Sequence, residues 1–226
     1  MVIGALADVH GNFDAMTRAM ERHQDVRFWL CVGDLSSRTG AYPDTPAPLY
    51  WIKGNNEDFT RIAAWEAGEP QPPRLHYIPN GTAVDVGPLR VAGLGGTFAP
   101  TWFDTPARQL PHAARDDKRR HFVREEAEAC KRLNGVDILM THEAARPFVV
   151  VDEPKPGARS RRRDAGKPAI NDVLATMKPR LHLCGHHHRY VESDREGIRS
   201  VCIDRVNRSY LLIDADTLVY EKVDQT

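Results

Sequence analysis

The sequence predicts a protein of the α/β class, and three observations lead to that prediction. Its 226 residues suit one large domain over 1–226 better than two domains. With 41% hydrophobic and 27% charged residues, the chain has an ordinary composition for a folded protein that buries a sizeable core. Short apolar runs of strand length alternate with segments of helical periodicity, which is typical of strands connected through helices.

In the first third of the chain, strands alternate with helices. Apolar runs of strand length occupy residues 2–7, 28–32 and 49–52. Apolar residues at helical spacing predict one helix over 13–23 and another over about 57–67. Asn56 is the expected N-cap of the second helix. Residues 36–48 are rich in Ser, Thr, Gly and Pro, so they predict a loop.

The middle of the chain is less regular. Strand candidates lie at residues 76–78, 82–86 and 89–94. The dipeptide Asn80-Gly81 predicts a hairpin between the first two of them. Residues 95–112 show no clear period, and irregular segments of this length are often functional. Residues 115–133 carry alternating charges with apolar residues on one side, which predicts an exposed amphipathic helix.

The last part of the chain returns to short strands. Strand-length runs occupy residues 136–141, 181–184, 201–203, 210–213 and 218–223. Residues 153–167 are the most polar stretch and predict a mobile surface loop. Its basic run at 159–163 is equally compatible with a lid that neutralises phosphates and with a solvated loop. Pro168 opens a helix that we expect to end near residue 177.

Charge and hydropathy argue against several classes of protein. Lys and Arg total 31 and are balanced by 31 Asp and Glu, so a whole-protein electrostatic grip on nucleic acid or membrane is not supported. No apolar run reaches the ~18 residues that a membrane helix needs. Residues 1–7 lack a basic lead and a cleavage site, so they predict a strand rather than a secretory signal.

The four cysteines of the chain are Cys31, Cys130, Cys184 and Cys202. They show no paired spacing, which predicts reduced core residues rather than disulfides or a zinc ribbon. We therefore expect a cytoplasmic protein that has no association with a membrane and no obligate protein partner.

Five of the predicted strands end in polar residues of the metal-ligand type. The endings are Asp8-Val9-His10, Gly33-Asp34, Gly54-Asn55, Thr141-His142 and Gly185-His186-His187-His188. Ligand sites in open α/β sheets lie at the carboxyl ends of strands, so we expect these residues to converge. Alternation along an extended segment puts Asp8 and His10 on one side. By the same rule His186 and His188 share a side, and His187 should point away.

This pattern supplies two Asp, four His and one Asn as candidate ligands. Mixed oxygen and nitrogen donors without a thiolate suit manganese, iron or zinc better than calcium or copper(I). Seven side chains are too many for one tetrahedral zinc ion with an open position. They suit two ions ~3.5–4 Å apart that share a carboxylate. Such a pair polarises a phosphoryl group and supplies a metal-bound hydroxide for in-line attack on phosphorus.

The ordered set Asp-x-His, Gly-Asp, Gly-Asn-x-Glu, a later His and Gly-His-x-His covers residues 8–188. This set resembles the calcineurin-like metallophosphoesterases. The resemblance implies a four-layer αββα sandwich, in which two mixed β-sheets pack together between flanking helices. It also implies a centre of two divalent ions, with manganese the expected metal and iron or zinc the alternatives.

The resemblance assigns metal ligands by position. One ion would be held by Asp8, His10 and His188, the other by Asn55, His142 and His186, and both would be bridged by Asp34. Arg38 lies four residues after Asp34, where the protein-phosphatase branch has an arginine that contacts phosphate. The residue before that arginine is acidic in the branch, whereas this chain has Ser37.

One position departs from the family pattern. The motif is usually Gly-Asn-His followed by Asp or Glu, and its His protonates the leaving group, whereas Asn56 stands there in this chain. An asparagine hydrogen-bonds but cannot donate a proton as an acid. The loss of a general acid costs ~10²–10⁴-fold for a poor leaving group. Asn56 is expected to cap the helix, with phosphate contact as the alternative role, and His76, His112 and His121 are candidate proton donors.

The resemblance therefore implies a hydrolase of phosphate esters. Some bacterial and archaeal members with Cys at the position of Asn56 are phosphodiesterases, so we predict a phosphodiesterase with nucleotides or RNA as candidate substrates. The expected catalytic residues are Asp34, Arg38, Asn55 and Asn56. A phosphomonoesterase or protein phosphatase is the first alternative, favoured by Gly11-Asn12 and the place of Arg38. A catalytically weak binding scaffold is the second, suggested by Asn56.

A fainter resemblance involves residues 91–98 and 138–143. Together with the long irregular segment and the charged stretch between them, they look like RNA lariat debranching enzymes, which cleave 2′,5′-phosphodiesters. Gly95-Gly96 is expected to let the backbone approach a substrate phosphate. This resemblance favours branched RNA among the candidate substrates.

Overall fold

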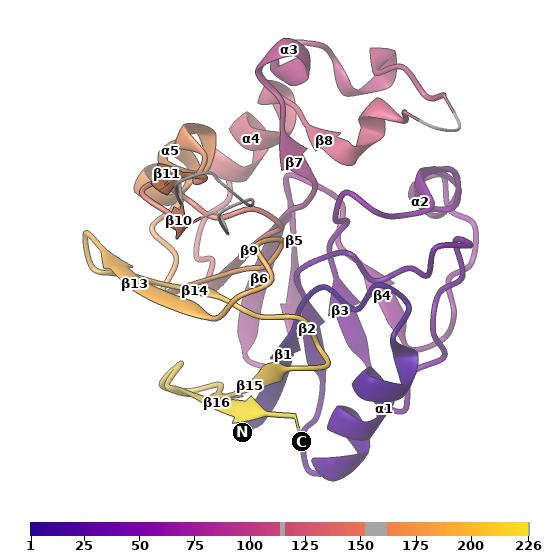
Figure 1. Cartoon of the computed structure of the whole chain (residues 1–226), viewed down its shortest axis with the longest axis vertical. Coiled ribbons are helices and arrows are strands. Elements are labelled where there is room, and N and C mark those ends of the chain that lie inside the picture. Colours follow the sequence, from indigo (N-terminus) through magenta and orange to yellow (C-terminus); the bar gives the residue numbers. More distant parts are fainter. Residues whose placement is uncertain (114–115, 152–161, 226) are drawn as a thin grey trace, which may run out of the picture.

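The computed structural model describes residues 1–113, 116–151 and 162–225, and its centre consists of two mixed six-stranded β-sheets (Figure 1). The first sheet has the order β16-β15-β1-β2-β3-β4. Its strands are β1 (Val2–Leu6), β2 (Trp29–Cys31), β3 (Leu49–Trp51), β4 (Leu75–Tyr77), β15 (Ser209–Asp214) and β16 (Tyr220–Asp224). Strands β1 to β4 pair in parallel, while β15 and β16 complete the sheet with antiparallel pairing.

The second sheet has the order β13-β14-β12-β9-β6-β5. Its strands are β5 (Thr82–Val86), β6 (Leu89–Leu94), β9 (Ile138–Thr141), β12 (Leu181–Cys184), β13 (Val191–Arg195) and β14 (Ile198–Cys202). The four inner strands are parallel and the two edge strands are antiparallel. Two small ribbons pair β7 (Thr97–Phe98) with β8 (His121–Phe122), and β10 (Val149–Val151) with β11 (Arg162–Asp164).

Four of the five α-helices in the described residues, all except the short α3, cover the outer faces of the two sheets. The five are α1 (Phe13–Arg22), α2 (Phe59–Glu66), α3 (Pro100–Phe103), α4 (Arg124–Lys131) and α5 (Pro168–Met177). Met16 of α1 and Trp65 of α2 pack with Trp29 against the first sheet. Cys130 of α4 and Ile170 of α5 belong to the cluster on the second sheet.

The two sheets pack against each other through their inner faces. Leu30 of the first sheet shares a buried cluster with Met140 and Leu183 of the second. Because each inner strand is buried on both faces, its sequence reads as an uninterrupted apolar run rather than an alternating one. The layers are therefore helices, sheet, sheet and helices, which confirms the predicted αββα sandwich.

Several smaller predictions are also confirmed. The helix expected from Pro168 ends at Met177, and α1 closely matches the predicted range 13–23. The four cysteines are buried and free. Within the described ranges, no helix combines the length and apolar character needed to cross a membrane.

The predicted hairpin at Asn80-Gly81 is wrong. The strands on its two sides, β4 and β5, belong to different sheets, and β5 pairs with β6 instead. Asn80 has another role, since its Oδ1 accepts from the backbone N–H of Gly95 at 2.6 Å and its Nδ2 donates to the Gly95 carbonyl. The dipeptide thus makes a turn from one sheet to the other.

The predicted helix over 115–133 is too long. Residues 114–115 lie outside the described residues, Lys118–Arg120 form a 3₁₀ turn, and Phe122 pairs in a strand with Phe98. The α-helix begins only at Arg124, where the Glu126 side chain accepts from the backbone N–H of Val123 at 2.9 Å. The alternating charges continue through the whole stretch, so they do not show where the 3₁₀ turn and the strand give way to the α-helix.

Two loop predictions need correction. Most of the predicted loop over 153–167 lies outside the described residues, but its last part forms β11. The basic run at 159–163 falls largely on that undescribed part. Gly95 and Gly96 let the chain pack closely on Lys53 and Arg120, respectively, so their close approach is to the protein's own backbone rather than to a substrate.

Candidate metal centre

The predicted ligands all follow the carboxyl ends of parallel strands. They are Asp8 and His10 after β1, Asp34 after β2, Asn55 after β3, His142 after β9, and His186 and His188 after β12. The first three of these strands belong to one sheet and the last two to the other. The packed sheets therefore bring the two sets of strand ends together, as the sequence pattern predicts.

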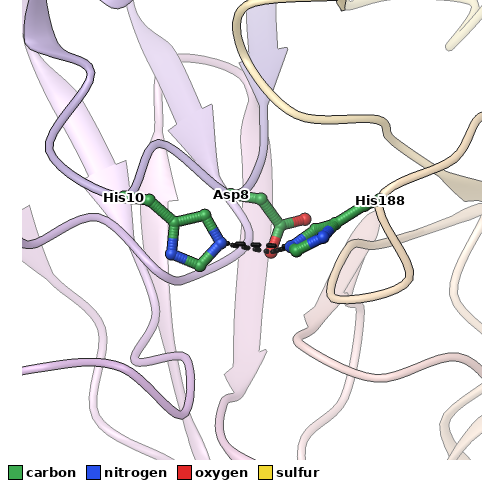
Figure 2. A group of neighbouring side chains, drawn as sticks. All are labelled: Asp8, His10 and His188. Atoms are coloured by element: carbon green, nitrogen blue, oxygen red, sulfur yellow. Dashed lines mark hydrogen bonds and ion pairs between the residues drawn. The ribbon is translucent and has the colours of Figure 1, made fainter.

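The first ligand group consists of Asp8, His10 and His188, whose side chains point toward one another (Figure 2). The Nε2 atoms of the two imidazoles are 3.1 Å apart. Oδ1 of Asp8 lies 3.6 Å from Nε2 of His188 and 3.9 Å from Nε2 of His10. We name this set the outer group, because all three residues line a cavity at the surface.

Only one oxygen of the Asp8 carboxylate is hydrogen-bonded to the protein among the described residues. Its Oδ2 accepts a hydrogen bond of 2.8 Å from the backbone N–H of His186. Its Oδ1 is buried and has no hydrogen-bond partner among the described residues. A buried carboxylate oxygen without a partner is costly, so an oxygen that faces two imidazole nitrogens fits a bound cation.

The second group, here the inner group, consists of Asn55, His142 and His186. Asp34 lies beside it, and Asp8 is also close enough to Asp34 and His142 to share a cation with them. Nε2 of His142 lies 3.0 Å from Oδ1 of Asn55 and 3.6 Å from Oδ1 of Asp34. The His186 ring centroid lies 5.0 Å from that of His142. His142 is fully buried, and Nδ1 donates to the Val32 carbonyl at 2.8 Å. Since a carbonyl can only accept, this bond fixes the ring and directs Nε2 at the group.

Asp34 lies between the two groups. Its Oδ2 is 3.6 Å from Nε2 of His10 in the outer group, and its Oδ1 is 3.6 Å from Nε2 of His142 in the inner group. Asn56 binds both oxygens, through its backbone N–H to Oδ1 and its Nδ2 to Oδ2, each at 2.8 Å. The carboxylate is therefore fixed with one oxygen directed to each group.

Asp34 and His142 change each other's pKa. Although burial disfavours the imidazolium form, the Asp34 carboxylate raises the pKa of His142 to about 10. Burial also opposes ionisation of Asp34, but His142 and the hydrogen bonds from Asn56 hold the pKa of that carboxyl well below its usual range. Without a cation the pair is thus a buried ion pair.

The backbone at the strand ends is strained where the ligands sit. Positive φ angles occur at Asp8 (49°), His10 (48°), Asp34 (53°), His186 (66°) and His188 (51°). Residues other than glycine rarely adopt this region, and such strain is typical of functional sites. Gly54 lies so close to Asp34 that a Cβ there would overlap its carboxylate, which explains why the position before Asn55 has no side chain.

Glu57 was given no role by the sequence analysis, yet it joins the two loops of the inner group. Its carboxylate accepts from the backbone N–H groups of Leu35 (2.9 Å), Ser36 (3.1 Å) and Gly54 (3.3 Å), and from the Tyr42 hydroxyl (3.1 Å). Burial and the charge of Asp34 raise its pKa to about 7. Its place in the Gly-Asn-x-Glu motif was the signal that could have found it.

Glu143 is a second residue that the sequence analysis left without a role. It is buried, and its Oε2 accepts from the backbone N–H of Phe98 at 2.6 Å. Its Oε1 lies 3.2 Å from Nζ of Lys167 and 3.7 Å from Nε2 of His186. It therefore positions His186 and anchors the irregular segment after β6. The signal for it was only its place next to His142.

A cavity of about 800 Å³ opens over the outer group. Asp8, His10, Asn55, Asn56 and His188 line it, as does Arg38, so the structure brings Arg38 to the same cavity as the candidate ligands. Arg205 also lines it, with Nη2 2.7 Å from Nδ1 of His188. Nothing in the local sequence around Arg205 predicts this contact, because it depends on the packing of the loop after β14.

The expected cap role of Asn56 is wrong. Asp58 caps α2 instead, with its Oδ1 accepting from the backbone N–H groups of Thr60 at 3.0 Å and Arg61 at 2.9 Å. The carboxylate two residues later takes both bonds, which leaves the Asn56 amide to bind Asp34.

The histidines predicted as proton donors or as non-ligands do not line the cavity among the described residues. His76 stacks on Tyr50 with centroids 4.6 Å apart, and Nδ1 of His121 lies 2.9 Å from Oγ1 of Thr97. His112 is exposed and also lies outside the wall. His187 stacks on Phe148 with centroids 4.2 Å apart, in keeping with the expectation that it is not a ligand.

Comparison with known proteins agrees with this arrangement. The sequence profile of the calcineurin-like phosphoesterases matches residues 1–190. The chain belongs to this family. The resemblance predicted from the strand-end motifs is thus confirmed, and with it the coarse function of a metal-dependent phosphoesterase. The donor set fits such an ion, because it combines imidazoles and carboxylates and leaves the buried Asp8 Oδ1 without a partner.

Individual relatives are more distant. A lariat debranching enzyme of Schizosaccharomyces pombe is 24% identical over 194 residues, which cover 80% of this chain and 42% of that protein. The chain thus spans less than half the length of that relative. The Thermus thermophilus protein TT1561 has a TM-score of 0.63 at 14% identity, with 99% of this chain and 98% of that one covered. A structure described as a novel archaeal phosphodiesterase has a TM-score of 0.54 at 12% identity, with 99% of each chain covered. Both structures share the fold.

Proposed function

We propose that this protein is a phosphodiesterase that uses two divalent metal ions, with manganese the expected metal. The observation that carries the proposal is the place of Asp34, whose two oxygens are each 3.6 Å from a histidine of a different group. A carboxylate shared in this way is what a pair of ions requires. In this proposal residues 1–226 act as one domain.

The ligand assignment follows from the two groups. Asp8, His10 and His188 hold one ion, while Asn55, His142 and His186 hold the other, and Asp34 contributes one oxygen to each. Two ions held by these residues would supply Lewis-acid chemistry to a phosphate ester and to an attacking water molecule. The cavity over the outer group gives a phosphate ester access to this place.

Protein side chains set the orientation of the shared carboxylate. Asn56 donates from both its backbone and its side chain to Asp34, and this keeps one oxygen directed at each group. Arg38 is exposed on the cavity wall, where a guanidinium suits the non-bridging oxygens of a phosphate. Asn55 is a ligand whose position is fixed by its contact with His142.

Asn56 is also the reason to favour a diester. An amide that already binds Asp34 has no proton to give to a leaving group. The three other candidate donors, His76, His112 and His121, do not line the described wall of the cavity. The 24% identity to a lariat debranching enzyme supports the same choice, since that protein's name refers to cleavage of a branched RNA.

A phosphomonoesterase remains the second candidate, and Arg38 on the cavity wall is the observation that favours it. The test compares hydrolysis of bis(p-nitrophenyl) phosphate and p-nitrophenyl phosphate by manganese-loaded protein, because both substrates release the same leaving group. We expect preference for the diester and loss of activity in Asp34→Asn. Preference for the monoester contradicts the proposal, and so does a wild-type rate equal to that of Asp34→Asn.

Replacement of Asn56 sharpens this test. Asn56→His restores the acid of the family motif, and we expect it to raise the rate on a monoester with a poor leaving group by ~10²-fold or more. The ratio of monoester to diester turnover is the measurement. An unchanged ratio means that this residue does not set the substrate preference. Asn56→Gln is the matched control, because it keeps an amide without an acid.

A further inference from the structure

Three arginines from separate segments line the cavity over the outer group. Arg38 follows β2, Arg120 lies in the 3₁₀ turn before β8, and Arg205 follows β14. The family motifs account only for Arg38. The other two are absent from the motifs, and only the packed structure brings them to this cavity.

These arginines are not neutralised by the protein. None of the three forms a salt bridge within the ranges that the structure describes. The neighbouring Arg119 is different, since it pairs with Asp117 at 2.5 Å. Four carboxylates also line the cavity, and each has another role. Asp117 pairs with Arg119, Asp58 caps α2, Glu57 accepts backbone N–H groups, and Asp8 is a candidate metal ligand.

Arg205 sits at the edge of the outer group. Its Nη2 is 2.7 Å from Nδ1 of His188, and its side chain is exposed. A guanidinium carries five N–H donors, so a contact with one imidazole nitrogen leaves most of them for an anion. Arg205 can therefore contact a phosphate close to the reacting one.

Arg120 is held in place from the other side. Its Nε donates to the Asp117 carbonyl at 2.9 Å, which fixes the base of the guanidinium, and its backbone packs on Gly96. Arg120 is only partly buried, so its remaining donors stay accessible in the cavity. A positively charged group that is fixed but unpaired suits an anionic ligand.

We propose that Arg120 and Arg205 bind phosphates that flank the scissile one, so that the substrate is a single strand of nucleic acid. The inference rests on the proposed phosphodiesterase function. A diester with a single phosphate offers only its two non-bridging oxygens, whereas three guanidiniums from separate segments line the cavity. A strand offers a phosphate at every nucleotide, and a cavity of about 800 Å³ holds more than one phosphate group. The formal net charge of zero gives no long-range attraction, so the nucleic acid is held by these local contacts.

The test measures binding apart from turnover. A fluorescein-labelled ten-nucleotide oligothymidylate is titrated with protein in EDTA, and its anisotropy is followed at several salt concentrations. Each phosphate contact on a single strand contributes ~0.7 to the slope of log K against log salt concentration. We expect Arg120→Gln and Arg205→Gln each to lower the magnitude of that slope by ~0.7 and to weaken binding at low salt.

Two controls separate this effect from net charge and from misfolding. Arg27→Gln makes the same charge change at an exposed residue before β2, at the end of that strand opposite Asp34, and should leave the slope unchanged. Arg205→Lys keeps a charge at the cavity and should keep most of the slope. An effect of Arg27→Gln equal to those of the cavity variants overturns the proposal.

Different results would contradict the nucleic-acid proposal and the phosphodiesterase function. If the wild type hydrolyses bis(p-nitrophenyl) phosphate but its oligonucleotide slope is the same in both cavity variants, the strand proposal is wrong and the phosphodiesterase stands. If the wild type hydrolyses neither chromogenic ester after manganese loading, the function fails, and with it the strand as a substrate.

Discussion

The outer and inner ligand groups differ in how firmly the protein holds them. In the inner group, His186 is about one-third exposed, but His142 is fully buried and its Nδ1 is fixed by the Val32 carbonyl at 2.8 Å. In the outer group, the rings of His10 and His188 are about one-third exposed and lie against each other. The only other hydrogen-bond partner of the His188 ring among the described residues is Arg205, whose own side chain is exposed.

The difference teaches which part of the centre is built in advance. A ligand that packing and a backbone hydrogen bond hold in place loses little freedom when a cation arrives. An imidazole that is one-third exposed and lacks such a backbone hydrogen bond must be ordered at that moment. We therefore expect the inner ion to bind more tightly and the outer ion to exchange more readily. Asp34 connects the two groups and should affect both.

The largest effect is expected from Asp34→Asn. The substitution removes the charge directed at both groups while it keeps the shape of the side chain. Activity should fall by ~10²–10³-fold, the range found when one electrostatic contact to a transition state is lost. Metal content, measured by mass spectrometry of the purified protein, should fall for both ions. A variant that keeps two ions would show that Asp34 is not shared.

Removal of one histidine from each group should separate the two ions that we propose. His142→Ala should weaken the tighter ion by ~100-fold or more, since even residues that only support a ligand contribute 10–100-fold. His188→Ala should affect the weaker ion and leave the tighter one in place. Calorimetric titration with manganese measures both steps. His112→Ala is the matched control, because this histidine is exposed and belongs to neither group.

Metal affinity should depend on pH through the inner group. In the metal-free protein the pKa of His142 is about 10, because the Asp34 carboxylate outweighs the effect of burial, so the ring carries a proton at neutral pH. A cation must displace that proton. Affinity for the tighter ion should therefore fall about tenfold for each unit by which pH decreases near neutrality. A manganese affinity of the wild type that does not change with pH would contradict displacement of the His142 proton by the cation.

The smallest effect is expected from Glu143→Gln. Its carboxylate lies 3.7 Å from Nε2 of His186 and pairs with Lys167, so it positions a ligand without being one. Manganese affinity should fall by ~10-fold, the lower limit for such supporting residues. Glu128→Gln, at a partly exposed residue of α4 that pairs with Lys131, is the control and should leave manganese affinity unchanged.

The sequence was sufficient for the fold and for the assembly of the candidate ligands. Polar residues directly after buried strands are readable as strand-end ligands, because parallel strands bring their carboxyl ends to one edge. The family resemblance then supplied the layer order, which the clusters on both faces of each sheet confirm.

The features that the sequence could not predict depend on competition between neighbouring residues or on packing between distant segments. Asn56 and Asp58 are both good helix caps, and only the structure shows that Asp58 takes the bonds of α2. Asn80-Gly81 has the composition of a hairpin turn, but a local signal cannot show that the next strand pairs in another sheet. Arg205 meets His188 only through the loop after β14.

The outer group joins parts of the chain that are 178 residues apart, since His10 and His188 face each other across it. A cation bound there therefore acts as a clasp between the beginning and the later part of the polypeptide. Because it binds only the folded arrangement, it shifts the unfolding equilibrium in favour of the native state by mass action. Chelation should thus lower the melting temperature as well as the activity, and His188→Ala should lose much of that thermal response.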